Sequence, residues 1–129
     1  LVVHAEDGLD EISIAATTRI AELRQGSITT SIITPESLGV QRQSLESLSV
    51  DSAEESLAVI RDVFAGKPGP ARDIVSINAG AAIYVSGLAK TLKEGVEVAR
   101  SALDTGAAAM KLEALVRFTQ SRSKGHPSP

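Results

Sequence analysis

The chain has 129 residues, the length of one ordinary domain, and its 43% hydrophobic and 22% charged residues are typical of a globular protein. It contains no cysteine, which excludes disulfides, zinc–thiolate sites and thiol nucleophiles, and its formal net charge of -3 argues against a nucleic-acid partner. Because no apolar run approaches the roughly 20 residues that span a bilayer, we expect a cytoplasmic protein without a membrane partner.

The first quarter of the chain favours β-strands, because β-branched side chains are dense there. An apolar run at residues 1–3 predicts a buried strand, and its abrupt start indicates that the chain is cut from a longer protein. Further strands are predicted at residues 12–16, 19–23 and 28–34. Gly26 can take the positive φ that a hairpin turn requires, so the last two strands are expected to pair antiparallel in one sheet.

The remainder of the chain favours helices. Asp51 with Glu54, and Thr91 with Glu94, fit the capping-box pattern that marks a helix start. Apolar residues then recur at helical spacing after each of these positions. Helices are expected over residues 52–65, 71–86, 92–103 and 108–118.

The conspicuous chemical feature is an acidic segment, residues 6–11, which reads Glu-Asp-Gly-Leu-Asp-Glu directly after the predicted first strand. The carboxyl ends of strands are where open α/β sheets bind ligands. Crowded carboxylates repel one another unless solvent or a cation lies between them, and Mg²⁺ is commonly held by one or two carboxylates plus substrate phosphates. A solvated Asp-Gly turn is the commoner use of such residues, so composition and spacing alone leave both interpretations open.

Other polar residues give weaker indications of a functional site. His4 fits a structural histidine better than a general base. Asp73 favours a helix start, with Arg72 solvated rather than bound to phosphate. Asn78, within a run of small residues, is expected to be a hydrogen-bonded core amide rather than a ligand. The sequence has no phosphate-cradling glycine loop and no credible Ser-His-Asp set, so we expect no catalytic residue in this chain.

Short motifs follow one another along the chain in a specific order. They are VVH at residues 2–4 with DGLDEIS at 7–13, ITPESLGV at 33–40, FAGKPGPARDIV at 64–75 with INA at 77–79, LKEGV at 92–96, and DTG at 104–106 with KLE at 111–113. In this order and spacing they resemble the late part of anthranilate phosphoribosyltransferases. The resemblance covers nearly everything from residue 1 to about residue 118.

The resemblance implies a homodimeric enzyme of tryptophan biosynthesis that transfers phosphoribosyl from phosphoribosyl pyrophosphate to anthranilate and releases pyrophosphate. It also implies that Asp10 and Glu11, which match the family's adjacent acidic pair, coordinate Mg²⁺. A divalent cation there would stabilise the departing pyrophosphate. Because adjacent residues of a strand face opposite ways, both carboxylates must lie past the strand end and point into a cleft, with Asp7 more exposed and not a ligand.

The chain departs from the family pattern in a few places. Ala5 stands where glycine is usual, and Ser49-Val50 and Glu55-Ser56 replace Gly-Gly and Asn-Ala. The family's pyrophosphate loop, its anthranilate-contacting residues and its N-terminal dimerisation domain lie upstream of the matched part. The resemblance therefore implies that this chain is inactive alone and that its partner is the missing N-terminal part of the same protein.

The sequence thus predicts an α/β fragment in which a partial sheet, from strands in residues 1–34, packs against C-terminal helices. The resemblance places it in the catalytic domain shared by nucleoside phosphorylases and phosphoribosyltransferases. Residues 1–120 are expected to form the C-terminal part of that domain, and residues 121–129 a disordered tail. Two alternatives stay open: a pyrimidine nucleoside phosphorylase-like enzyme, and a non-enzymatic nucleic-acid-binding relative, which the acidic segment disfavours.

Overall fold

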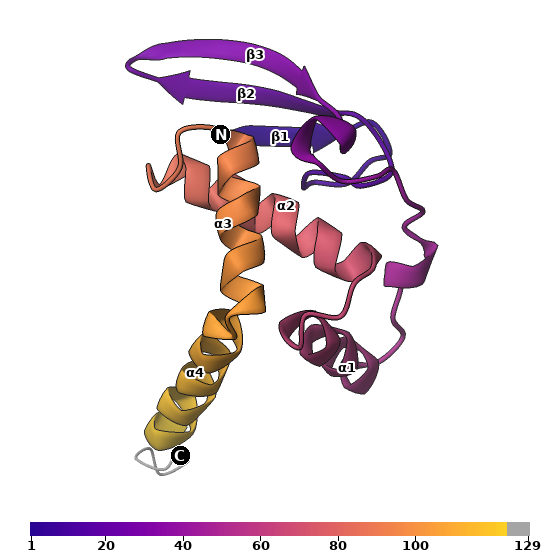
Figure 1. The fold of residues 1–129 in the computed structure, drawn as a ribbon, viewed down its shortest axis with the longest axis vertical. Helices are drawn as coiled ribbons and strands as arrows, with labels where there is room; N and C mark the ends of the chain where they lie inside the picture. Colours follow the sequence, from indigo (N-terminus) through magenta and orange to yellow (C-terminus); the bar gives the residue numbers. More distant parts are fainter. Residues whose placement is uncertain (124–129) are drawn as a thin grey trace, which may run out of the picture.

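A computed structural model describes residues 1–123 as a small antiparallel sheet that rests on a group of helices (Figure 1). The sheet consists of β1 (Val2–Ala5), β2 (Thr18–Arg24) and β3 (Ser27–Ile33), in that order. Val3 lies opposite Ile20, and Ile20 opposite Ser31, in two antiparallel pairs. The turn from β2 to β3 places Gln25 and Gly26 at φ 50° and 80°, a geometry that suits the twist of paired strands. The predicted hairpin is confirmed.

The strand predicted at residues 12–16 is wrong. Ile12 and Ile14 are buried, with 2% and 0% exposure, but they belong to an irregular loop. The Asn78 side chain bonds both peptide groups of Ile12, and the Gln43 N–H donates to the Ile14 carbonyl at 2.9 Å. These partners replace a neighbouring strand, so the dense β-branched residues here reflect burial and not strand pairing.

Four α-helices follow in the described part of the chain, as predicted. They are α1 (Ala53–Phe64), α2 (Pro70–Val85), α3 (Leu92–Asp104) and α4 (Ala107–Ser123), preceded by the single turns η1 (Glu36–Leu38) and η2 (Glu46–Leu48). The helix start predicted at Thr91 is confirmed, because its hydroxyl accepts from the Glu94 N–H at 3.1 Å. The last helix continues to Ser123, three residues into the predicted tail, and residues 124–129 lie outside the described part. Within residues 1–123, no helix has the length and apolar character needed to cross a membrane.

The start of α1 differs from its prediction by one residue. The Ser52 hydroxyl, and not Asp51, accepts from the Glu55 N–H, at 3.1 Å. The Glu55 carboxylate in turn accepts from the Asp51 N–H at 3.0 Å. The predicted pairing of Asp51 with Glu54 is therefore wrong, because a serine one position later offers the same capping chemistry. Glu55, one of the departures from the family pattern, here helps to begin a helix.

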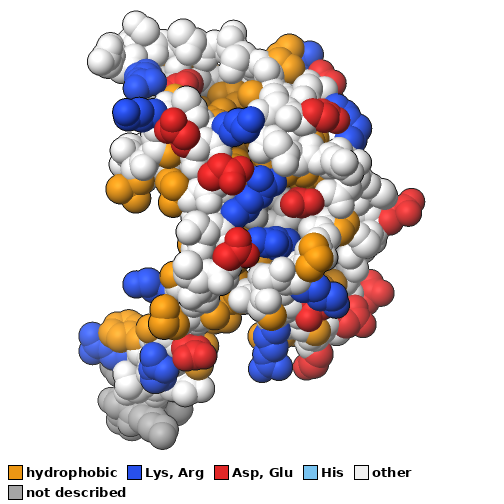
Figure 2. Space-filling view, in the orientation of Figure 1, with side chains coloured by type: hydrophobic (Ala, Val, Ile, Leu, Met, Phe, Trp, Pro, Cys, Tyr) orange, Lys and Arg blue, Asp and Glu red, His pale blue; other side chains and the backbone are white. Residues whose placement is uncertain are grey.

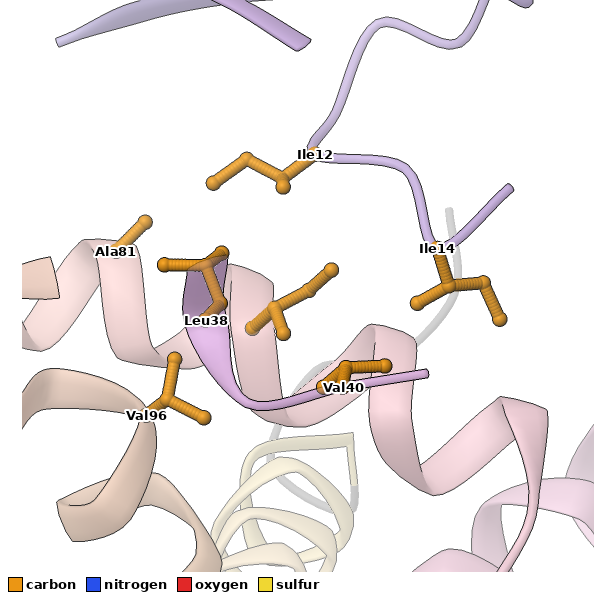
Figure 3. Packing of buried hydrophobic residues seen from close by; sticks show 7 residues of the cluster. Ile12, Ile14, Leu38, Val40, Ala81 and Val96 are labelled. Carbon is orange, nitrogen blue, oxygen red and sulfur yellow. The ribbon is translucent and has the colours of Figure 1, made fainter. Parts of the chain in front are cut away.

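The core lies where α2 and α3 meet the loop that follows β1. Its buried side chains are all aliphatic: Ile12, Ile14, Leu38, Val40, Ile77, Ala81 and Val96 (Figure 3). The two helices approach closely because Gly80 faces Gly95. A Cβ placed on Gly80 would lie 2.6 Å from the backbone nitrogen of Val96, well inside ordinary contact. This close crossing fixes α2, the helix on which the loop rests.

The face of the sheet that is turned away from the helices is open. Val2, Leu23, Ile28 and Ile32 share that face through the strand register, and their side chains are between 61% and 72% exposed. The predicted burial of the first strand is therefore wrong for Val2. Leu23, in the central strand, is as exposed as Val2, so the uncovered face of the sheet and not the position of the strand leaves these side chains in solvent.

Helix α4 projects from the rest of the molecule (Figure 1). A hollow of about 600 Å³ separates it from α1, lined by apolar side chains that include Leu57, Phe64, Leu112 and Val116. Figure 2 shows this hollow at the lower edge of the molecule and shows acidic and basic side chains interspersed over the same face. No two adjacent carboxylates line the hollow, and it is separate from the cavity beside the acidic segment at residues 6–11.

Candidate metal centre

The acidic segment lies in the loop that joins β1 to β2. Gly8, at φ 95°, lets the chain turn as soon as β1 ends, and its N–H donates to the Ala5 carbonyl at 3.0 Å. Asp10 and Glu11 follow this turn, so neither is part of the extended strand. The structure confirms that the pair lies past the strand end, where adjacent side chains need not face opposite ways.

Ser13 organises the middle of the loop. Its hydroxyl donates to the Asp7 carboxylate at 2.5 Å and accepts from the N–H groups of Ala15 and Ala16 at 2.8 and 3.1 Å. The Ser13 N–H donates to the Thr18 hydroxyl at 3.2 Å. Asp7 therefore helps to shape the loop. It is exposed, as predicted, but the predicted contrast with the acidic pair is absent from their burial, because Asp10 and Glu11 are exposed too.

Asp10 and Glu11 both line one cavity, of about 390 Å³, between the loop and α2. The remaining lining residues are Leu1, Val3, Ile12, Asn78, Ala81, Ala82 and Val85. Neither carboxylate forms an ion pair with a Lys or Arg of residues 1–123. The structure thus brings the two predicted residues to one cavity and leaves their oxygens accessible.

The pair carries negative charge that the surrounding side chains do not balance. Although Glu11 is exposed, the protein displaces part of the water around its carboxyl, and this desolvation, followed by the nearby charge of Asp10, raises the pKa of the Glu11 carboxyl above its ordinary value of 4.5. A divalent cation at this position would offset the repulsion. Within residues 1–123 no group of three or more His, Asp or Glu side chains is arranged to hold a metal ion. The donor set fits Mg²⁺, which accepts one or two carboxylates and fills its other positions with water and phosphate.

The raised pKa of Glu11 predicts a pH dependence of stability without metal. The folded state binds the Glu11 proton more tightly than the unfolded chain does, so the free energy of unfolding falls as pH rises from 4.5 through the raised pKa. Ionised Glu11 then costs stability at neutral pH, and Glu11→Gln removes that cost. We expect the variant's Tm, measured by thermal unfolding without Mg²⁺, to equal or exceed that of wild type at neutral pH. The advantage should shrink as pH falls below 4.5, and a variant that is less stable at neutral pH contradicts the argument.

The other polar candidates lie away from the acidic pair. His4 is on the open face of the sheet and does not line the cavity. Asp73 accepts from the Gln43 side chain at 2.6 Å. The prediction that Arg72 is solvated is wrong, because its guanidinium pairs with Asp104 at 2.5 Å and its side chain is only 21% exposed. That pair links α2 to the end of α3, which sequence spacing did not indicate.

Asn78 is a hydrogen-bonded, half-buried amide, as predicted. Sequence reasoning missed its partner, which is Ile12 in the acidic loop, 66 positions away. The available signal was the run of small residues around Asn78, since small side chains let another segment approach a helix closely. That signal indicates that another segment contacts the helix, but it does not identify the segment.

Comparison with known proteins places the chain in a family. The family described as "Glycosyl transferase family, a/b domain" matches residues 1–109. The chain belongs to this family, whose α/β architecture agrees with the sheet and helices described above.

Individual relatives share one name. The chain is 58% identical over 121 residues to the anthranilate phosphoribosyltransferase of Thioalkalivibrio sulfidiphilus, covering 94% of this chain and 36% of that protein. It is 54% identical over 123 residues to the enzyme of the same name from Saccharophagus degradans, covering 92% of this chain and 36% of the relative. The chain therefore spans little more than a third of the length of the relatives it matches.

Solved structures agree with these relatives. The crystal structure of anthranilate phosphoribosyltransferase from Thermus thermophilus matches with a TM-score of 0.82 and 38% identity, over 92% of this chain and 35% of that one. The Saccharomyces cerevisiae enzyme in complex with PRPP and Mg matches with a TM-score of 0.82 over 92% of this chain and 34% of that one. Its identity is 22%, so this second likeness supports the fold alone.

Proposed function

We propose that this chain is part of an enzyme that transfers phosphoribosyl from phosphoribosyl pyrophosphate to anthranilate and releases pyrophosphate. The observation that carries the proposal is 58% identity, over 94% of the chain, to a relative named for that activity. Because the chain covers only 36% of that relative, the activity belongs to a full-length protein. Residues 1–120 would form the C-terminal part of its catalytic domain, in keeping with the order of the motifs in the sequence.

Asp10 and Glu11 would bind Mg²⁺ in that enzyme. When bound there, Mg²⁺ would supply positive charge beside the departing pyrophosphate, which becomes more negative as its bond to the ribose carbon breaks. The two carboxylates bind and orient the ion, and the turn at Gly8 carries both of them past the strand. Their accessible oxygens and the cavity beside them support this assignment. The choice of ion agrees with the Mg in structures of the yeast enzyme.

A homodimer in the cytoplasm is part of the same proposal, because the family resemblance implies it. The dimer contacts of the family belong to an N-terminal helical domain upstream of the matched part. We therefore expect residues 1–123 to contribute little to the dimer. Light scattering on the full-length protein measures the stoichiometry directly.

The full-length protein is expected to consume anthranilate when phosphoribosyl pyrophosphate and Mg²⁺ are supplied, whereas this chain alone is not. The chain would provide part of the metal site but neither the pyrophosphate loop nor the anthranilate site. Loss of anthranilate fluorescence measures the reaction, with both proteins prepared from a host that lacks its own enzyme. Turnover by the chain alone contradicts the fragment assignment. Phosphorolysis of a pyrimidine nucleoside by the full-length protein, without anthranilate consumption, would favour the nucleoside phosphorylase alternative.

A further inference from the structure

The Asn78 side chain, midway along α2, holds both peptide groups of Ile12. Its Oδ1 accepts from the Ile12 N–H at 2.9 Å, and its Nδ2 donates to the Ile12 carbonyl at 2.9 Å. The same Nδ2 donates to the Ile74 carbonyl, within α2, at 3.0 Å. Both amide hydrogens are therefore used. A flipped amide would set its NH₂ against an N–H and its oxygen against two carbonyls, so only one orientation satisfies every partner.

Ile12 follows the acidic pair directly and is fixed at two points. Its side chain is 2% exposed and lies in the core cluster beside α2, with Ala81 among its companions (Figure 3). Its backbone is fixed by Asn78. The peptide that joins Glu11 to Ile12 supplies the N–H that Asn78 binds. The hydrogen bond therefore fixes the direction in which the chain runs from the core residue Ile12 to Glu11. The acidic pair is thus attached to a rigid helix through one residue.

Asn78 also lines the cavity that Asp10 and Glu11 line. Its Oδ1, the amide atom that could coordinate Mg²⁺, already accepts from the Ile12 N–H, and its amide hydrogens are used by Ile12 and Ile74, so its role is to support the loop. Adjacent residues of an extended chain face opposite ways, so two neighbouring carboxylates serve one ion only if the local backbone is held in another conformation.

We propose that Asn78 is a positioning residue for the Asp10–Glu11 pair. By holding the Ile12 peptide groups against α2, it keeps the two carboxylates at one cavity in the arrangement that binds Mg²⁺. The inference rests on the proposed function, because it concerns how that metal site is built. Residues that orient metal ligands without touching the metal contribute about 10- to 100-fold to metal affinity or activity.

Calorimetric titration of Mg²⁺ into the full-length protein, with inorganic pyrophosphate present, measures this contribution. Asn78→Ala is expected to weaken Mg²⁺ binding about tenfold. The Mg²⁺ concentration for half-maximal turnover should rise by the same factor. Saturating Mg²⁺ should restore most of kcat, because both carboxylates remain. A purely structural role would instead lower the folded fraction and leave the Mg²⁺ midpoint unchanged.

Ser76→Ala is the matched control. Ser76 is buried on the same helix, and its hydroxyl donates at 2.7 Å to the Arg72 carbonyl within that helix. Its removal should lower Tm without changing Mg²⁺ affinity. Asn78→Ser is the second test variant, because a serine can still bond the Ile74 carbonyl one turn earlier but is too short to hold Ile12. It should weaken Mg²⁺ binding about as much as the alanine variant does.

Glu11→Gln, measured in parallel, distinguishes failure of the positioning role of Asn78 from failure of the metal site itself. If Glu11→Gln weakens Mg²⁺ binding and the Asn78 variants bind as wild type does, the positioning role is overturned and the metal site stands. If Glu11→Gln itself binds Mg²⁺ as wild type does, the metal site fails and the positioning role fails with it. Where Asn78→Ala does not fold, the titration of Asn78→Ser decides the matter.

Discussion

Gly95→Ala is expected to destabilise the protein by about 3 kcal/mol or more, the upper end of what overpacking costs. A Cβ on Gly95 would overlap the carbonyl oxygen of Gly80, and one on Gly80 would lie 2.6 and 2.7 Å from backbone atoms of Val96. The obstacle on both sides is main chain, which no rotamer change can move away. The two helices would have to separate at the centre of the core. That loss is a large fraction of the roughly 5–15 kcal/mol by which domains are stable.

The direction of the change in stability distinguishes a clash from the intrinsic helix preference of alanine. Without a clash, replacing glycine by alanine inside a helix stabilises by about 1 kcal/mol. Ala58→Gly, at an exposed position of α1, calibrates that term and should destabilise by a similar amount. Urea unfolding of the full-length protein and of both variants gives the free energies. If Gly95→Ala is as stable as wild type, the helices do not cross as closely as the structure shows.

The helices could be predicted because their signals are local. Apolar spacing and the Thr91–Glu94 box mark α3 without reference to the rest of the chain. At α1 the same logic chose Asp51 over Ser52, since both residues cap helices and three-residue spacing to an acid fits each of them. Local chemistry thus determined that a helix begins there, and only the folded geometry determined at which residue.

Features that depend on distant partners could not be predicted. Ile12 and Ile14 have the composition of a strand, but their peptide groups bond to Asn78 and Gln43 and so form a loop. Val2 has the composition of a core residue, yet it lies on the face of the described sheet that no helix covers. Hydrophobicity predicts that a side chain avoids water, but it does not specify which neighbours surround it.

The candidate site also combines features that the sequence indicates with features that depend on distant partners. Asp10 and Glu11 were identified from the resemblance, and the alternation of side chains along a strand indicated that both must lie past the strand end. The structure brings both carboxylates to one cavity. The contribution of Asn78 was not predicted, because a side chain that bonds a peptide group 66 positions away leaves no spacing to read. Supports of this kind are found only when the loop and the helix are seen together.

Asp10→Asn and Glu11→Gln are each expected to reduce Mg²⁺-dependent turnover of the full-length protein strongly while leaving it folded. Either change removes one of the two charged oxygen ligands that the described residues would contribute to the site. The expected loss of transition-state stabilisation is about 3 kcal/mol, or on the order of a hundredfold in rate, the scale of one well-placed electrostatic contact. Both side chains are exposed and form no ion pair within residues 1–123, so Tm and circular dichroism should change little.

Glu6→Gln is the matched control for these variants. Glu6 is an exposed acid of the same loop, it does not line the cavity, and its carboxylate lies 3.5 Å from Arg19 in a surface ion pair. Such pairs contribute little to stability, so this variant should keep both the rate and the Mg²⁺ dependence of wild type. Turnover measured against Mg²⁺ concentration for all four proteins distinguishes a ligand from general loss of negative charge. If Asp10→Asn and Glu11→Gln also retain the wild-type rate and Mg²⁺ dependence, the acidic pair is a solvated loop that binds no metal.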